Sequence, residues 1–299
     1  MNVSIIIVNY NTRDLLANCI NSIYKFTKNI TFEIIIVDNA STDGSQKYVK
    51  FNFPQVILIE SDENLGFGKA NNLGVKDAKG EFLFFLNSDT LLIENSIGKL
   101  FSFFLENENK LNIGVLGSIL VDENLESNGY GNSFPTCNKE NRKNWNRIPF
   151  LRHLFYNPTL KTYDIENDYF EIDYVIGADM FLRKTLFDKV EGFYKNFFMY
   201  YEESDLQKRI QNLGFRQYIF TKTKIIHLEE GSGKVIKNYS NKKRIITHQS
   251  KVIYLKRNDR KDFNKFVFFD FLFLVSNFFN FKYTIRENFK YFKDILKTY

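Results

Sequence analysis

The chain has 299 residues, of which 44% are hydrophobic and 25% charged, so it can bury a sizeable core as one large domain or two small ones. It is rich in aromatic residues, with 33 Phe and 17 Tyr, and the spacing of its two cysteines indicates neither a disulfide framework nor a zinc site. Because no signal peptide is apparent and no stretch reaches the roughly 20 apolar residues of a spanning helix, a cytoplasmic protein is expected.

Charge is distributed unevenly along the chain. Residues 234–299 contain 16 Lys and Arg against 5 Asp and Glu, a net charge of +11, whereas the whole chain carries +6. Residues 1–233 are therefore mildly acidic, at about −5. A basic tail on an acidic body predicts an anionic partner. The body lacks nucleic-acid-binding motifs, which favours an anionic membrane surface over nucleic acid.

Apolar strands alternate with helical segments in residues 1–90. This is the βαβ pattern of a parallel sheet that is covered by helices on both faces. The expected strands are Val3–Val8, a run ending at Asp38, Gln55–Glu60 and Phe82–Leu86. The expected helices are a segment with Thr12 as its N-cap, a short helix capped by Ser41 or Thr42, and Phe67–Ala78.

The pattern is less regular after residue 90. Residues 122–168 hold three of the four prolines and the only Trp, and they predict a long functional or mobile loop. The other expected elements are helices over 93–105, 184–190 and 202–213, and strands over 113–121, 170–182, 215–220 and 224–227.

Polar residues follow three of the first four predicted strands. They are Asn9, Asp38 and the run Asn87-Ser88-Asp89. Open parallel sheets bind ligands outside the carboxyl ends of their strands, so these side chains are candidates for a site. The first turn has no G-x-G-x-x-G, and no G-x-x-x-x-G-K-[ST] occurs anywhere, which argues against a dinucleotide fold and a P-loop NTPase.

Seven blocks of sequence together resemble a known family. In order they read VSIIIVNYN, IIIVDNASTDGS, ENLGFGKANNLG, GEFLFFLNSDT, VIGADMFLRKTLFDKVEGF, FFMYYEESDLQKRIQNLGF and IIHLEEGSG. They resemble the inverting nucleotide-sugar transferases of glycosyltransferase family 2, in particular the rhamnosyltransferase-like branch. The resemblance implies an α/β GT-A fold, with a nucleotide-binding half (1–90) and an acceptor-binding half (91–233). A basic, aromatic-rich helical extension (234–299) lies outside it.

The resemblance implies which residues hold the nucleotide. Val8, Asn9 and Tyr10 match the turn that holds the base and ribose. Asp38 matches the carboxylate that pairs with the base edge, where an acceptor-only group is chemically suited. Each of these assignments has a structural alternative. Asp38 could be only a turn residue, and the glycine-rich loop could be only a loop that begins a helix. That loop matches the nucleotide loop of the family at Asn64, Gly66, Phe67, Asn71 and Asn72.

Asn87-Ser88-Asp89 matches the D-x-D position of this fold and so belongs to the implied nucleotide site. A divalent cation, Mg²⁺ or Mn²⁺, held there would stabilise the negative charge that builds on the leaving diphosphate. Asn87 stands where the D-x-D motif has its first Asp, so Asp89 is the one carboxylate of the motif that can serve as a ligand. His227 matches a position that completes the metal or diphosphate contact, and a structural histidine is the alternative.

Inverting transfer also needs a general base for the acceptor hydroxyl. The Glu-Asp motif of the family falls on Glu202-Glu203, which implies Glu203 as the base, with Glu202 as the alternative. Acidic residues favour the first turn of a helix through its dipole, and this explains any single one of these acids without chemistry. It explains poorly why three of the four residues 202–205 are acidic. Asp179 is expected to face the acceptor.

The C-terminal extension holds 13 Phe or Tyr among residues 263–292, interleaved with Lys and Arg. Its most apolar part, residues 266–281, is too short and too interrupted to span a bilayer. A helical segment of this kind suits the plane of an anionic membrane, which predicts a peripheral position on the inner face of the cell membrane. The alternative is packing against the catalytic body or a second subunit, so a homo-oligomer stays open.

The predicted function is transfer of a sugar from dTDP-rhamnose or a UDP-hexose to a hydroxyl of a glycan or lipid-linked oligosaccharide in cell-surface polysaccharide synthesis. Two alternatives remain. One is a sugar-phosphate nucleotidylyltransferase, which would need a Gly-rich loop bearing Arg and Lys after the first strand, a feature that VNYNTRD lacks. The other is a non-catalytic, membrane-associated scaffold with this fold.

Overall fold

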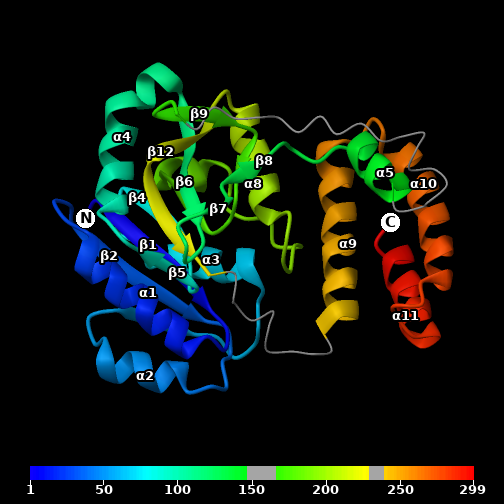
Figure 1. Cartoon of the computed structure of the whole chain (residues 1–299), viewed down its shortest axis with the longest axis horizontal. Coiled ribbons are helices and arrows are strands. Elements are labelled where there is room, and N and C mark those ends of the chain that lie inside the picture. Colours follow the sequence, from blue (N-terminus) through cyan, green and yellow to red (C-terminus); the bar gives the residue numbers. More distant parts are fainter. Residues whose placement is uncertain (147–165, 229–238) are drawn as a thin grey trace. The chain divides into compact units, whose positions relative to one another are not determined.

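The computed structural model describes residues 1–146, 166–228 and 239–299. These residues form two compact units (Figure 1). Unit 1 comprises Met1–Ser133, Asp164–Phe198 and Glu202–Ile236, and unit 2 comprises Phe134–Tyr163, Met199–Tyr201 and Lys237–Tyr299. Each unit is therefore assembled from several separate stretches of the chain.

Unit 1 is built around a ten-stranded sheet. Its strands are β1 (Val3–Asn9), β2 (Phe32–Asp38), β3 (Ile57–Glu60), β4 (Phe82–Asn87), β5 (Thr90–Leu92), β6 (Ile113–Val121), β7 (Ser127–Gly129), β9 (Tyr169–Ile172), β11 (Asp179–Arg183) and β12 (Arg216–His227). The order is β3-β2-β1-β4-β11-β6-β12-β5, with β7 beside β6 and β9 beside β12. The first four strands of this order are parallel, whereas β11 is antiparallel to both neighbours. Strands β8 (Gly131–Asn132) and β10 (Tyr174–Val175) pair separately.

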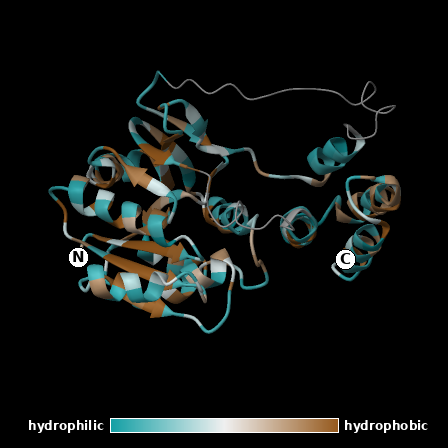
Figure 2. Cartoon of the chain, turned by 60° about the horizontal axis from the view of Figure 1, so that its bottom comes forward, coloured by the Kyte–Doolittle hydropathy of each residue, from teal (hydrophilic) through white to brown (hydrophobic). Residues whose placement is uncertain are grey.

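Helices cover both faces of this sheet, as the unbroken apolar strands predict. Val3, Ile5 and Ile7 of β1 point into a core shared with α1 and α4. On the opposite face, Gly74 of α3 lies against Ile6 and Val37. Figure 2 shows the hydrophobic strands, in brown, enclosed by helices with hydrophilic outer residues. The helices of unit 1 are α1 (Arg13–Phe26), α2 (Ser45–Asn52), α3 (Phe67–Val75), α4 (Ser96–Leu111), α7 (Lys184–Lys189) and α8 (Glu202–Asn212).

The α/β architecture with a mostly parallel, helix-flanked sheet is confirmed, but three predictions of strands and loops are wrong. Residues 170–182 form three strands in place of one, because β9, β10 and β11 pair with three different partners. The two strands predicted over 215–220 and 224–227 are one strand, β12, with a register shift between Phe220 and Lys224. The loop predicted over 122–168 contains β7, β8 and α5, while its residues 147–165 lie outside the described residues.

Unit 2 is helical in its described residues. Its elements are α5 (Cys137–Asn146), α9 (Tyr239–Asn258), α10 (Phe263–Ser276), the short η1 (Asn277–Phe279) and α11 (Ile285–Leu296). Thr284 and Glu287 form a capping box that begins α11. In the part of the chain that the structure describes, no helix has both the length and the apolar character needed to cross a membrane. The apolar α10 has 14 residues and is about 21 Å long, against about 30 Å of hydrocarbon core.

Candidate functional site

The carboxyl ends of three neighbouring strands bring together polar residues that lie far apart in the sequence. Asn9 of β1 is opposite Asp38 of β2, and Val8 is opposite Asn87 of β4. Val8 and Tyr10 are both half-buried at this end of β1. The sheet therefore places the predicted base and ribose turn, the predicted base carboxylate and the Asn-Ser-Asp run along one edge.

Asp38 is buried, and hydrogen-bond donors hold both of its carboxylate oxygens. Asn9 Nδ2 donates to Oδ2 at 2.7 Å. The backbone N–H of Ser41 and the side-chain amide of Gln46 donate to Oδ1 at 2.9 Å and 2.7 Å. Asp38 thus makes the backbone contact expected of a turn residue, and its role in binding a nucleotide stays a prediction. Neither Ser41 nor Thr42 caps α2, which follows Gly44.

Thr12 links this cluster to the Asn-Ser-Asp run. Its hydroxyl donates to Asn9 Oδ1 at 2.7 Å and lies 2.9 Å from Ser88 Oγ. Thr12 occupies the N-cap position of α1 as predicted, but its side chain makes no cap hydrogen bond. A cap pattern is local and does not reveal that the same hydroxyl can bond across the sheet edge, so sequence reasoning missed this link.

Asp89 and His227 are neighbours although 138 positions separate them. His227 lies opposite Thr90 in the β12–β5 pairing, and its Nε2 is 3.4 Å from Asp89 Oδ1. The side-chain nitrogen of Asn87 is also 3.4 Å from Nε2. The backbone N–H of Leu228 donates to the Asp89 carbonyl, which fixes the end of β12 against this turn. The structure thus joins the two residues that the resemblance implied as metal ligands.

The donor atoms at this point suit a hard divalent cation. Asp89 offers carboxylate oxygens and His227 an imidazole nitrogen, and Mg²⁺ or Mn²⁺ at a diphosphate needs only one or two protein ligands. Among the described residues, no group of three His, Cys, Asp or Glu side chains could hold a metal by itself. The pair therefore fits a cation whose coordination is completed by diphosphate and water.

Asp179 begins β11 opposite Leu86, so it lies at the same edge of the sheet. It is fully buried, and the backbone N–H and hydroxyl of Ser118 donate to its Oδ2 at 2.7 Å and 2.6 Å. Its Oδ1 has no hydrogen-bond partner among the described residues. Burial raises the pKa of Asp179 to about 7, against the lowering effect of Ser118 and His227. An ionisable group is therefore held near His227, one of the two predicted metal ligands.

Glu202 and Glu203 open helix α8 next to the glycine-rich loop. A Cβ added at Gly68 would lie 3.5 Å from that of Glu202. One added at Gly177 would lie 3.4 Å from the Phe67 ring and 3.8 Å from Glu203 Cβ. Glu203 therefore neighbours the segment that leads into β11. Burial raises the pKa of the Glu203 carboxyl to about 7, which suits a base that works near neutral pH.

The third acid of this turn has a structural partner. Asp205 is fully buried, and Arg209 Nε donates to it at 2.9 Å. The same guanidinium also donates to the carbonyls of Val190 and Gly192. Asp205 thus has a structural role, because it holds the Arg209 side chain that ties α8 to the segment after α7.

The predicted nucleotide loop is held by its own asparagines. Asn64 Oδ1 accepts from the Gly66 N–H, and Asn39 Nδ2 donates to the Gly66 carbonyl. Asn71 donates to the Phe67 carbonyl inside α3, while Asn72 both donates to and accepts from the backbone of Phe193. The amides of Asn71 and Asn72 therefore brace the loop, and their direct contact with a nucleotide stays a prediction. The Asn39–Gly66 and Asn72–Phe193 bonds join residues far apart in sequence, so no local pattern predicts them.

Gly66→Ala is expected to lower the free energy of unfolding by about 2–4 kcal/mol. Gly66 has φ +79°, and an added Cβ would lie 1.9 Å from the backbone oxygen of Phe198. Gly44→Ala is the matched control, because Gly44 has φ +85° but open space around it. Urea unfolding measures both costs. Circular dichroism is the suitable signal, because the single Trp, Trp145, lies in unit 2 and its fluorescence would not report on unit 1, which holds both glycines. Equal costs for the two variants would contradict this close approach.

A protein-family model described as Glycosyl transferase family 2 matches residues 4–190, more than half of the chain. This region contains the strand ends of β1, β2 and β4, the glycine-rich loop, the Asn-Ser-Asp run and Asp179. It ends before Glu202, Glu203 and His227.

Three curated relatives are named for glucosyl transfer or for teichoic acid biosynthesis. A poly(ribitol-phosphate) beta-glucosyltransferase of Bacillus spizizenii is 34% identical over 40% of this chain and 20% of its own length. The minor teichoic acid biosynthesis protein GgaA of Bacillus subtilis is 27% identical over 81% of this chain and 50% of its own. WfgD of Escherichia coli, a UDP-Glc:alpha-D-GlcNAc-diphosphoundecaprenol beta-1,3-glucosyltransferase, is 31% identical over 35% and 42%. The chain spans half or less of each of these relatives.

Two solved structures share the fold. TarS of S. aureus, residues 1–349 in complex with UDP, has a TM-score of 0.57 and 18% identity, covering 100% of this chain and 81% of TarS. The mannosyltransferase PcManGT from Pyrobaculum calidifontis, in complex with GDP-Man and Mn²⁺, has a TM-score of 0.57 and 16% identity, covering 97% and 73%. The predicted GT-A type of fold is confirmed by this likeness.

Proposed function

The chain belongs to glycosyl transferase family 2, and from this premise we propose that it transfers a sugar from a nucleotide-sugar donor to a hydroxyl group in cell-surface polysaccharide synthesis. The observation that carries the proposal is the meeting of Asp89 and His227 at the edge of the sheet where β1, β2 and β4 end. The names of two relatives contain poly(ribitol-phosphate) and GlcNAc-diphosphoundecaprenol, which supports a glycan or lipid-linked saccharide as acceptor.

The donor diphosphate is proposed to bind at the Asn-Ser-Asp run. Asp89 and His227 would hold Mg²⁺ or Mn²⁺, which, when bound, neutralises charge on the leaving diphosphate. The complexes of the two similar folds with UDP, and with GDP-Man and Mn²⁺, support this assignment. Two of the relatives are named for glucosyl transfer, which favours a UDP-hexose over dTDP-rhamnose as the donor.

The acid–base chemistry is assigned to α8. In an inverting step the acceptor oxygen attacks the anomeric carbon as the bond to the diphosphate breaks, and the hydroxyl proton must pass to a base. Glu203 is the proposed base because it is partly exposed and has a raised pKa, whereas Glu202 is only 2% exposed. Asp179 is fully buried, so its expected contact with the acceptor stays a prediction.

Release of nucleoside diphosphate tests the reaction class. The full chain is incubated with Mn²⁺, a lipid-linked saccharide fraction and, in turn, UDP-glucose and dTDP-rhamnose. Sugar transfer to the lipid fraction with release of UDP or dTDP is the expected result. Pyrophosphate release from a nucleoside triphosphate and a sugar phosphate would support the nucleotidylyltransferase alternative instead. No turnover with any donor would favour the scaffold.

The pH dependence of kcat/KM is expected to follow the ionisation of Glu203. Because a general base must be deprotonated and burial raises the pKa of Glu203 to about 7, kcat/KM should fall about tenfold for each pH unit below that value. An Asp179→Asn variant is the control, since the pKa of Asp179 is also raised to about 7. This variant should keep the acidic limb. A limb centred near the usual pKa of about 4.3 for Glu, or one lost with Asp179→Asn, would contradict the assignment.

A further inference from the structure

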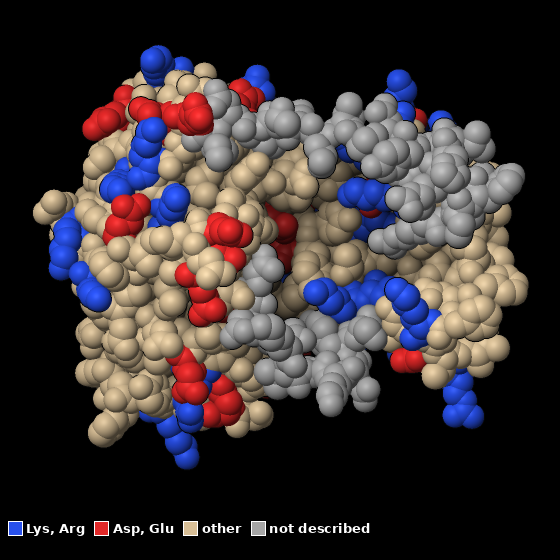
Figure 3. Space-filling model, viewed as in Figure 1, with Lys and Arg blue, Asp and Glu red and all other residues tan. Residues whose placement is uncertain are grey.

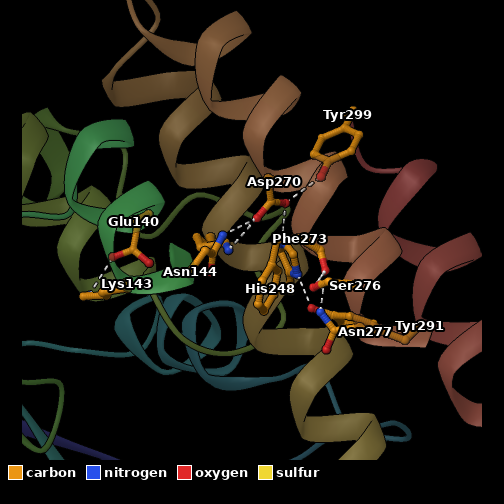
Figure 4. A network of polar contacts seen from close by, with 11 residues as sticks. Glu140, Lys143, Asn144, His248, Asp270, Phe273, Ser276, Asn277, Tyr291 and Tyr299 are labelled. Atoms are coloured by element: carbon orange, nitrogen blue, oxygen red, sulfur yellow. Dashed lines mark hydrogen bonds and ion pairs between the residues drawn. The ribbon is translucent and has the colours of Figure 1, made fainter. Parts of the chain in front are cut away.

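The orientation of α10 in unit 2 is fixed by a buried carboxylate. Asp270, on α10, is fully buried (Figure 4). Burial alone would raise the pKa of Asp270, but Lys251 and His248 hold it well below its usual range. Its four partners are His248 Nε2 at 2.5 Å and Lys251 Nζ at 3.2 Å on α9, Asn144 Nδ2 at 2.8 Å on α5, and Tyr299 Oη at 2.5 Å. An unpaired buried charge is costly, so this network holds the Asp270 side of α10 inward.

His248 completes the network as a neutral ring. Burial lowers the pKa of His248 to about 4. A neutral imidazole can donate from Nε2 to Asp270 and accept at Nδ1 from the hydroxyl of Tyr291, 2.5 Å away on α11. Arg244 of α9 also lies over the ring of Tyr291, at 4.0 Å from its centroid. Helices α9, α10 and α11 are thereby locked around one polar centre.

With Asp270 inward, the opposite side of α10 is exposed although it is apolar. Phe268, Phe271, Leu272 and Val275 follow the i, i+3, i+4, i+7 spacing of one helix face, and each is at least 40% exposed. Brown residues run along much of α10 in Figure 2. A helix that is apolar on all sides normally has partners on all sides. Among the described residues of unit 2, α11 approaches this outer face only in part, and all four side chains stay substantially exposed.

The exposed apolar face continues onto α11. The Phe271 ring lies 6.1 Å from that of Phe292, which joins the two helices. Ile285 and Phe289 extend the stripe along α11, and both are well exposed. The turn between the helices adds the two most exposed aromatic side chains of this region, Phe279 at 74% and Phe281 at 95%. We call these residues together with the outer face of α10 the apolar face of unit 2.

A row of basic side chains runs beside this apolar face. On α11, each residue of the apolar stripe is followed by a cation at the next position: Arg286, Lys290, Lys293 and Lys297 follow Ile285, Phe289, Phe292 and Leu296. The acids of α11 are engaged, since Glu287 caps the helix with Thr284 and Asp294 accepts from Lys290. On the face shown in Figure 3, unit 2 likewise displays more Lys and Arg than Asp and Glu. The rim of the apolar face is therefore positively charged.

We propose that the apolar face of unit 2 lies on an anionic phospholipid bilayer, with α10 and α11 parallel to its plane. Aromatic side chains would enter the headgroup region, and the basic row of α11 would contact lipid phosphates. The helices are too short to cross, which agrees with binding in the plane. The proposal goes beyond the catalytic assignment, and its test requires no turnover.

Charge favours a bilayer over a second copy of the chain on this face. A two-fold dimer would place the same patch against itself. The basic row of one copy would then approach that of the other, and the described residues of the apolar face include no exposed acidic row to balance it. Anionic headgroups supply the missing negative charge.

Vesicle flotation of the full chain tests the proposal. The protein is mixed with phosphatidylglycerol–phosphatidylcholine vesicles or with pure phosphatidylcholine vesicles, at low and high salt. The aromatic variant combines Phe279→Ser, Phe281→Ser and Phe289→Ser, all at exposed positions. The charge variant combines Arg286→Gln and Lys293→Gln. Phe51→Ser and Lys47→Glu, on exposed positions of α2 in unit 1, are the matched controls.

The wild type should float with the anionic vesicles and bind them less at high salt. The partition coefficient should fall at least about tenfold in the aromatic variant and about tenfold in the charge variant, while both controls stay unchanged. Wild-type protein that does not float, or variants that float as the wild type does, would overturn the proposal. So would a wild-type dimer, measured by light scattering, that the aromatic variant converts to monomer without affecting flotation.

Discussion

Glu203→Gln is expected to lower kcat by about 10²- to 10⁴-fold while leaving donor affinity nearly unchanged. The amide keeps the size of the side chain and its place at the start of α8, but it cannot accept the acceptor proton. A base acts in the transition state and contributes little to ground-state binding of the nucleotide, so kcat is the parameter that should change. Steady-state release of nucleoside diphosphate measures the rate, and calorimetric titration of the nucleotide measures the affinity.

Two further variants make this result interpretable. Glu106→Gln changes an exposed carboxylate on α4 and should leave kcat unchanged. Glu202→Gln separates the two candidate bases, because a loss confined to Glu203→Gln assigns the role to Glu203. A loss confined to Glu202→Gln would transfer the role to Glu202, and full activity in both variants would remove the base from α8.

Asp89→Asn is expected to lower kcat/KM by about 10²- to 10³-fold, because the site loses its carboxylate ligand for the cation at the leaving diphosphate. The loss should be greatest at low Mn²⁺ and should shrink as Mn²⁺ is raised, since the weakened site can still be partly filled. Activity measured over a range of Mn²⁺ concentrations gives the apparent metal affinity of each variant.

Two further variants serve as comparisons for Asp89→Asn. Asp77→Asn removes an exposed carboxylate beyond the end of α3 and should have no effect on the Mn²⁺ dependence. Asn87→Asp restores a second acid to the run and should tighten the apparent metal affinity. If Asp89→Asn retained the Mn²⁺ dependence of the wild type, the cation would have to be held elsewhere.

The sequence was most informative where one physical pattern dominates. Uninterrupted apolar strands, each ending in polar residues, placed Asn9, Asp38 and Asp89 at one edge of a parallel sheet, and the structure agrees. The proximity of Asp89 and His227 was expected only from the family resemblance. Their sequence separation gives no local signal, because it depends on the β12–β5 pairing.

Other features depend on partners that no local pattern reveals. Thr12 reads as a helix cap, yet its hydroxyl bonds Asn9 and approaches Ser88 across the sheet edge. Residues 170–182 read as one apolar strand, but competition among three pairing partners divides them. In the C-terminal extension, the sequence alone shows Asp270 only as a polar residue that interrupts the apolar run 266–281. Its partners on α5 and α9 and at Tyr299 make it the centre of unit 2.

Calorimetric titration of nucleoside diphosphates into the wild type and Asp89→Asn tests the central claim most directly. UDP, dTDP and GDP are titrated with and without Mn²⁺. We predict that one of them binds the wild type preferentially and that Mn²⁺ strengthens this binding. Asp89→Asn should lose the Mn²⁺-dependent part, whereas Glu203→Gln should keep it. Binding that is equal for all three nucleotides and indifferent to Asp89, or no binding at all, would contradict a nucleotide-sugar site at this edge of the sheet.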